Sequence, residues 1–137
     1  MQNRMKTHQM SETEINSLLR QSQCGVIATV NPDGTPYCVP VHFVFINDTV
    51  YIPGLPAGKK LENISANPDV CFTAYEMKGL LYDPEEKPGD TNTEYVSAVI
   101  QGRAVIDNDN ESKKKCCMRL YASIRLILHK KIYLIIC

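Results

Sequence analysis

The stretch that decides the fold is Tyr37-Cys38-Val39-Pro40-Val41-His42-Phe43-Val44-Phe45, followed one hairpin later by Gly58-Lys59-Lys60-Leu61-Glu62-Asn63-Ile64. The first segment is rich in β-branched and aromatic residues, which favour strands, and Pro40 lies in its middle. A strand that tolerates proline has a free edge or a ligand beside it. In the second segment, Lys59 and Lys60 at a helix start offer charge and backbone N–H groups to a phosphate. Together the two segments predict a small β-barrel with a phosphorylated cofactor bound to it.

The strand predicted over residues 37–46 has two unlike faces, because side chains alternate along a strand. A histidine on such a strand has two interpretations. His42 is either a core or interface residue held by one hydrogen bond, or a ligand contact that donates a proton near neutral pH. One face carries Val39, Val41, Phe43 and Phe45, and the other carries Cys38, Pro40, His42 and Val44.

The remaining patterns predict a chain of short elements around this strand. Tight turns between neighbouring strands indicate antiparallel pairing. The order therefore predicts a mainly β fold, a six-stranded antiparallel split barrel with peripheral helices, and an open α+β sheet is the alternative. The expected elements are a helix over 11–22 with a Ser11–Glu14 capping box, strands over 24–30, 49–52 and 70–75, turns at 31–36 and 47–48, a helix over 57–67, a loop over 78–92, a long strand over 94–106 with a bulge or bend at Gly102, and a helix over 111–122.

Length and composition limit the class of protein. A chain of 137 residues is one domain, which we place at 11–122, after a mobile N-terminal arm over 1–10. Residues 123–137 are an atypical tail, either a last strand or a foreign segment from a frame change or truncation. The net charge of zero gives no attraction to nucleic acid or anionic lipid. Without a run of about 18 apolar residues or a secretory signal, we expect no membrane span and a cytoplasmic location.

The six cysteines indicate neither a zinc site nor a disulfide framework. Cys24, Cys38 and Cys71 lie in apolar β-like runs, where a free thiol behaves as a small hydrophobic side chain. No C-x-x-C occurs, and the histidines show no ligand spacing to a cysteine, so we expect no metal site. The sequence also lacks P-loop, G-x-S-x-G, H-E-x-x-H and G-x-G-x-x-G motifs, which disfavours hydrolase and Rossmann-type functions.

A set of short motifs in a fixed order resembles a known family over about residues 11–120. The chain is similar to the pyridoxamine 5'-phosphate oxidase-like superfamily of flavin-binding split-barrel proteins, and within it to the nitroimidazole-resistance (Nim) branch. This resemblance implies a homodimer with FMN bound in two clefts at the subunit interface. The motifs are Ala28-Thr29-Val30, Asp33-Gly34-Thr35-Pro36, Val39-Pro40-Val41, Gly58-Lys59-Lys60-Leu61, Asn63-Ile64, Asn67-Pro68 and Val70-Cys71-Phe72.

The resemblance also implies which residues contact the cofactor. Lys59 and Lys60 match positions that bind the phosphate, and Ser97 on the long strand matches a position that reaches the flavin. Ile52 and Pro53 end a strand near the ring and the ribityl chain. His42 is the candidate catalytic residue, as a proton donor. The strand beside the flavin ring contributes Val39, Pro40, Val41 and His42.

Two departures from the family pattern narrow the expected activity. Nim proteins commonly carry a histidine where this chain has Pro53, and pyridoxamine phosphate oxidases carry basic residues where it has Val39 and Val44. The resemblance implies an FMN-dependent oxidoreductase that reduces a small electron-poor acceptor, such as a 5-nitroimidazole-type nitro compound, rather than vitamin B6 chemistry. Two alternatives stay open: a non-enzymatic flavin- or haem-binding carrier or sensor, and a truncated inactive family member.

Overall fold

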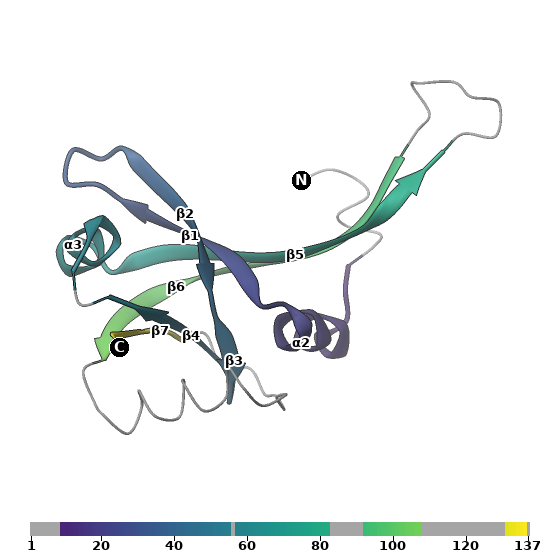
Figure 1. The fold of residues 1–137 in the computed structure, drawn as a ribbon, viewed down its shortest axis with the longest axis horizontal. Helices are drawn as coiled ribbons and strands as arrows, with labels where there is room; N and C mark the ends of the chain where they lie inside the picture. Colours follow the sequence, from purple (N-terminus) through teal and green to yellow (C-terminus); the bar gives the residue numbers. More distant parts are fainter. Residues whose placement is uncertain (1–8, 56, 83–91, 108–130, 137) are drawn as a thin grey trace.

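The computed structural model of the chain describes residues 9–55, 57–82, 92–107 and 131–136 (Figure 1). These residues form two helices and one seven-stranded sheet, so the predicted mainly β architecture with peripheral helices is confirmed. The strand order across the sheet is β2-β1-β5-β6-β7-β4-β3. In chain order the elements are α2 (Glu12–Gln21), β1 (Cys24–Val30), β2 (Pro36–His42), β3 (Val44–Ile46), β4 (Thr49–Gly54), α3 (Lys59–Ala66), β5 (Asp69–Leu81), β6 (Asn92–Asp107) and β7 (Lys131–Ile136).

The strand predicted over 37–46 is divided at Phe43 into β2 and β3. β2 pairs antiparallel with β1, whereas β3 pairs antiparallel with β4. At the division, the Phe43 N–H donates to the carbonyl of Gln23 at 3.2 Å. β2 and β3 are the two outer strands of the described sheet, yet they are consecutive in the chain. The sheet is therefore rolled so that one chain segment connects its two edges, which is the arrangement of a split barrel.

The change of partner at Phe43 also alters which side chains are buried. In β2 the predicted alternation holds, because Val39 and Val41 pack partly against the core while Pro40 and His42 are exposed. In β3 all three residues are buried, Val44 included. A strand that meets elements on both of its faces buries both sets of side chains, so the alternation ends where β3 begins.

The described sheet has seven strands rather than six, because the segment predicted as one strand over 37–46 forms both β2 and β3. The last strand, one of the two alternatives for residues 123–137, is present as β7. β7 lies between β6 and β4 and is parallel to both, whereas the other described strand pairs are antiparallel. A tight turn would have made β7 antiparallel to β6, but a segment as long as 108–130 allows a parallel return to the sheet. The predicted helix over 111–122 and most of the N-terminal arm lie outside the described residues.

β5 and β6 continue past the other strands as a long two-stranded arm (Figure 1). The predicted loop over 78–92 is therefore wrong for residues 78–81, which extend β5, and for Asn92, which begins β6. The register of this pair is regular at Gly102, and the bulge lies instead between Met77 and Gly79. The extra residue of this bulge is Lys78, beside Gly79 in the arm, where no third strand of the described residues pairs with β5 or β6.

The core lies on the inner side of the sheet and is built around two aromatic rings. Phe43 and Phe72 meet edge to face, with ring centroids 4.8 Å apart and planes 70° apart. The two helices add their buried apolar side chains to this core. Its most deeply buried members include Leu19, Ile27, Phe43, Phe45, Val50, Ile52 and Phe72.

Two local signals, a helix cap and a hairpin turn, form where the sequence predicted them. The Ser11 hydroxyl accepts the N–H of Glu14, and the Glu14 carboxylate accepts the N–H of Ser11, which completes the capping box of α2. Asn47 and Asp48 have φ values of 46° and 60° and form the two-residue turn between β3 and β4. Asparagine and aspartate tolerate this left-handed conformation better than other side chains, which favours such hairpin turns.

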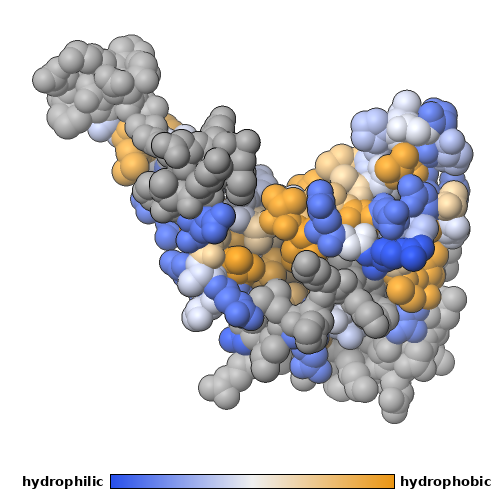
Figure 2. All heavy atoms as spheres, turned by 180° about the vertical axis from the view of Figure 1, so that it is seen from behind, coloured by the Kyte–Doolittle hydropathy of each residue, from blue (hydrophilic) through white to orange (hydrophobic). Residues whose placement is uncertain are grey.

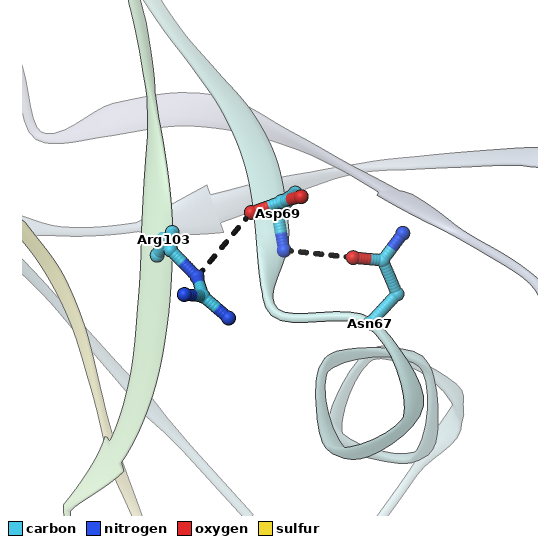
Figure 3. A network of polar contacts seen from close by, with 3 residues as sticks. All are labelled: Asn67, Asp69 and Arg103. Carbon is cyan, nitrogen blue, oxygen red and sulfur yellow. Dashed lines mark hydrogen bonds and ion pairs between the residues drawn. The ribbon is translucent and has the colours of Figure 1, made fainter.

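A small polar network fixes the passage from α3 into β5 (Figure 3). The side-chain Oδ1 of Asn67 accepts the backbone N–H of Asp69 at 3.1 Å, and Arg103 Nε lies 3.4 Å from an Asp69 carboxylate oxygen. The ion pair is well exposed, so it contributes about 1 kcal/mol at most. The Ala104 N–H also donates to the carbonyl of Pro68 at 2.8 Å. These bonds hold the C-terminal end of α3 against β6.

Gly25→Ala should destabilise the protein by about 2 kcal/mol, because an added methyl group overpacks the core. A Cβ at Gly25 would overlap the ring of Phe72 and lie 2.9 Å from the Thr73 carbonyl oxygen. The measurement is urea unfolding, with Gly54→Ala as the matched control, since a Cβ there would meet only the flexible Lys60 ammonium at 3.8 Å. Equal unfolding midpoints for the two variants would contradict this packing.

Candidate functional site

The first turn of α3 has backbone and side-chain features that suit an anion. Gly58 is the N-cap, with a φ of +139° that L side chains rarely adopt, and no side chain caps the helix. The N–H groups of Leu61 and Glu62 bond the Gly58 carbonyl, at 2.9 and 3.1 Å. The N–H groups before them belong to the set that has no intrahelical acceptor. An uncapped helix start of this kind favours a phosphate or another anion.

Lys60 brings a partly desolvated positive charge to this helix start. Its side chain is half-buried, and this burial lowers the pKa of its ammonium group. No carboxylate of the described residues forms an ion pair with it. The ammonium lies over the end of β4, because a Cβ at Gly54 would be 3.8 Å from Lys60 Nζ. A half-buried cation without a carboxylate neighbour fits an anionic ligand. Lys59, beside it, is exposed.

A buried asparagine fixes α3 against the β1–β2 hairpin. Asn63 has no exposed surface, and its Nδ2 donates to Thr29 Oγ1 at 3.0 Å and to Asn31 Oδ1 at 2.9 Å. Its Oδ1 has no hydrogen-bond partner among the described residues. Two donated bonds from one buried side chain determine where the helix lies relative to the strand. Nothing in the sequence around Asn63 indicated a role for it beyond its motif.

The hydrogen bonds continue from Asn31 through the turn between β1 and β2. Asn31 Nδ2 donates to Thr35 Oγ1 at 2.9 Å, and Thr35 Oγ1 donates to an Asp33 carboxylate oxygen at 2.6 Å. The hydroxyl and the backbone N–H of Thr35 lower the pKa of Asp33, and the positive charge of Lys59 lowers it further. The turn, the buried asparagine and the helix start therefore form one connected unit.

His42 lies at the end of the β1–β2 ladder that is farthest from the turn between these strands. The ladder pairs Cys24 with His42 at one end and Val30 with Pro36 at the other. Six residues of extended strand separate these ends by about 20 Å. Within one chain, the structure therefore does not bring His42 together with the lysines of α3.

His42 is instead next to a thiol that the sequence analysis did not single out. Cys24 Sγ lies 3.4 Å from His42 Nδ1, and both side chains are exposed. The sequence prediction missed this contact by one residue: the predicted turn at 31–36 would pair residue 24 with residue 43, whereas the structure pairs Val30 with Pro36 and therefore Cys24 with His42. Beside this pair is an open hollow of about 390 Å³, lined by Gln21, Ser22, Gln23, Cys24, Tyr75 and Glu76.

The other predicted cofactor contacts divide into exposed and buried positions. Pro40 and Ser97 are exposed, on β2 and β6, and Ser97 pairs with Tyr75 across the β5–β6 ladder. Pro53 is half-buried near the end of β4. The side chains of Val39, Val41 and Ile52 point into the core, where Ile52 is fully buried, so these three can offer only backbone groups to a ligand.

One outer face of the sheet carries His42, Ser97 and several exposed apolar side chains. The register places Tyr75 opposite Ser97, Met77 opposite Tyr95 and Thr73 opposite Val99 on this face. Val99 is 64% exposed, and the other apolar side chains here are similarly uncovered. Figure 2 shows hydrophobic surface in the hollow between the protruding arm and the rest of the molecule. We call this surface, which spans β2, β1, β5 and β6, the outer sheet face.

The sequence profile of the pyridoxamine 5'-phosphate oxidase family matches residues 11–125. The chain belongs to this family. A search of curated protein sequences finds no match. Within the described residues, no group of three or more histidine, cysteine or acidic side chains could hold a metal ion, and neither helix is long and apolar enough to cross a membrane.

Solved structures agree with the family assignment. A candidate 5-nitroimidazole antibiotic resistance protein from Bacteroides thetaiotaomicron is 26% identical, with a TM-score of 0.70 over 88% of this chain and 72% of that chain. A FAD-binding protein from Mesorhizobium loti is 24% identical, with a TM-score of 0.63 over 82% of this chain and 74% of that chain. A FAD- and haem-binding protein from Mycobacterium smegmatis is 20% identical, with a TM-score of 0.71 over 88% of this chain and 60% of that chain. The last two likenesses show a shared fold.

Proposed function

We propose that this chain is an FMN-dependent oxidoreductase that reduces a small electron-poor acceptor, with 5-nitroimidazole-type nitro compounds as the first class to test. The observation that carries the proposal is the half-buried ammonium of Lys60 beside the uncapped start of α3. Family membership and the flavin-binding proteins among the structural neighbours support a flavin as the ligand.

The residues at the start of α3 fit the terminal phosphate of FMN. A phosphate monoester carries nearly two negative charges at neutral pH, which matches two ammonium groups and a helix N-terminus. Lys59 and Lys60 would hold this phosphate, and Gly58 would let the backbone approach it. Bound FMN would supply electron transfer from a reduced donor to the acceptor, while the protein supplies position and electrostatics.

The remaining predicted residues would contact the flavin ring and the substrate from β2, β4 and β6. Pro53, Ser97 and the exposed backbone of β2 at Pro40 would orient the ring and the substrate. His42 would deliver a proton from Nε2, because Nδ1 faces Cys24. The three core-facing residues, Val39, Val41 and Ile52, would contribute backbone contacts only.

A homodimer would complete the site. Within one chain, His42 lies about 20 Å from the lysine end of the ladder, so the proton donor and the phosphate-binding lysines of one chain are far apart. The exposed apolar side chains of the outer sheet face are typical of a surface that another molecule covers. We propose that a second copy covers this face in the cytoplasm and brings its own His42 toward the cofactor.

The first test of this function is the absorption spectrum of the protein as purified, followed by titration with FMN. We expect a yellow protein, or a colourless one that binds FMN stoichiometrically, and oxidation of NADH when a nitroimidazole is added. A protein that stays colourless and ignores added FMN would refute the proposal.

Val99→Glu should convert the dimer into a monomer, because it places a charge in the middle of the outer sheet face, where burial without a partner is costly. Sedimentation velocity measures the change. Thr13→Glu is the control, since it adds the same charge to an exposed position of α2. A dimer that persists in Val99→Glu would show that this face is not the interface.

A non-enzymatic carrier or sensor is the second candidate. The observation that favours it is the distance of about 20 Å between His42, the candidate proton donor, and the lysine end of the ladder within one chain. Steady-state turnover separates the two functions: tight FMN binding without NADH oxidation in the presence of several acceptors supports the carrier.

A further inference from the structure

The proposed flavin function uses His42 but gives no role to the thiol of Cys24 that contacts it. A thiol becomes a nucleophile when a neighbouring base takes its proton. His42 Nδ1 lies 3.4 Å from Cys24 Sγ, within the range of a hydrogen bond to sulfur. In the tautomer with its hydrogen on Nε2, the Nδ1 atom accepts the thiol hydrogen. β1 and β2 hold this pair in register, because Cys24 and His42 are directly opposite each other.

The surroundings of Cys24 provide room for a second molecule. The thiol opens into the hollow of about 390 Å³ where β1 begins beside β5. This volume lies within the range of small-molecule sites. Amide, hydroxyl and carboxylate groups line it, from Gln21, Ser22, Gln23 and Glu76. Tyr75 and Cys24 complete the lining, so the hollow offers both hydrogen-bonding groups and apolar surface to a small molecule.

We propose that Cys24 is a thiol modification site that forms a mixed disulfide with a low-molecular-weight disulfide such as that of glutathione. His42 Nδ1 takes the proton of the Cys24 thiol as Sγ attacks one sulfur of the small disulfide. The Sγ–S bond forms, the original S–S bond breaks, and the leaving thiolate takes the proton. The exchange needs no further oxidant, because one disulfide is consumed for each one formed.

Two other described cysteines serve as internal controls. Cys38 is exposed on β2 and Cys71 is partly exposed on β5, and no histidine contacts either of them in the described part of the chain. Cys38 is the closer match, since it lies on the outer sheet face in the strand that carries His42. If exposure alone decided reactivity, Cys24 and Cys38 would react at similar rates.

The test treats the full-length protein with glutathione disulfide, stops the reaction by alkylation, and quantifies each cysteine by peptide mass mapping. Cys24 should be modified at least about tenfold faster than Cys38. This factor is smaller than the roughly hundredfold or greater rate increase that a positioned general base gives. His42→Asn should slow Cys24 about tenfold and leave Cys38 unchanged. Equal rates at Cys24 and Cys38, or an unchanged Cys24 rate in His42→Asn, would overturn the proposal.

A second variant protects the test against a folding defect. In His42→Ala, added imidazole should restore the Cys24 rate without affecting Cys38, provided that the circular dichroism spectrum matches that of the wild type. If the His42→Asn variant is misfolded, the imidazole experiment tests the proposal instead. Failure of imidazole to restore the Cys24 rate would show that His42 does not activate the Cys24 thiol. Because His42 also belongs to the proposed flavin site, the rates are measured on the apoprotein and the FMN affinity of each variant is measured separately. A Cys24 rate that falls while FMN affinity is unchanged supports the thiol proposal alone, and FMN binding with equal rates at Cys24 and Cys38 supports the flavin proposal alone.

Discussion

Replacing both Lys59 and Lys60 with alanine should weaken FMN binding about a hundredfold. Each charge-assisted hydrogen bond to a phosphate contributes about 1.5 kcal/mol at the low end of its range, so two contribute about 3 kcal/mol. Every 1.4 kcal/mol is a factor of about ten in the dissociation constant. Lys60 should account for the larger share, because its ammonium is half-buried whereas Lys59 is exposed. Titration of FMN fluorescence measures the constants for the double variant and for each single variant.

Riboflavin separates a phosphate effect from a general loss of the site. It has the ring and the ribityl chain of FMN but no phosphate, so its affinity should be nearly the same in the wild type and in the double variant. Lys78→Ala is the matched lysine control, because Lys78 is exposed on β5, in the arm. An unchanged FMN affinity in the double variant would remove the lysines from the phosphate site. An equal loss for riboflavin would indicate that the substitutions disturb α3 as a whole.

Asn63→Ala should lower the free energy of unfolding by about 3 kcal/mol. The substitution removes two hydrogen bonds at a fully buried position, and it leaves the oxygen atoms of Thr29 and Asn31 without their donor. An unsatisfied buried polar atom costs about 1–3 kcal/mol, and a small cavity adds to this. Urea unfolding of the apoprotein measures the change.

The same variant should also weaken FMN binding, since Asn63 holds α3 against the turn that follows β1. The control is Asn67→Ala, which removes one bond to the backbone of Asp69 near the surface and should cost less than about 1 kcal/mol. If Asn63→Ala were as stable as Asn67→Ala, the buried network would not be what positions the helix. A stability loss with unchanged FMN affinity would show that the network serves the fold alone.

The parts of the fold that depend on neighbouring residues were predictable from the sequence. β1 has the predicted bounds, the Ser11–Glu14 capping box starts α2, and Asn47-Asp48 forms the turn between β3 and β4. Each of these features depends on side chains within about four residues of one another, so a short sequence pattern is enough to predict it. The phosphate site at α3 was proposed on the same basis, because its glycine and lysines are consecutive.

Features that depend on distant residues were missed. The bulge at Met77–Gly79 and the length of the arm depend on how β5 and β6 pair, and the sequence of either strand alone is compatible with a shorter hairpin. Asn63 was not recognised as a buried anchor, since its partners lie more than thirty positions away. The parallel pairing of β7 with β4 and β6 joins segments that no short motif connects.

By itself, the sequence determined the mainly β class, the hairpins, the helix starts and the family, because periodicity, turn chemistry and capping act over a few residues. Only the tertiary structure decided that the chain changes partner at Phe43, that Cys24 faces His42, and that His42 and the α3 lysines lie at opposite ends of one ladder. These arrangements arise from strand register and from packing around Phe72. Both are set by contacts among residues far apart in the chain, whose combined burial outweighs any local preference.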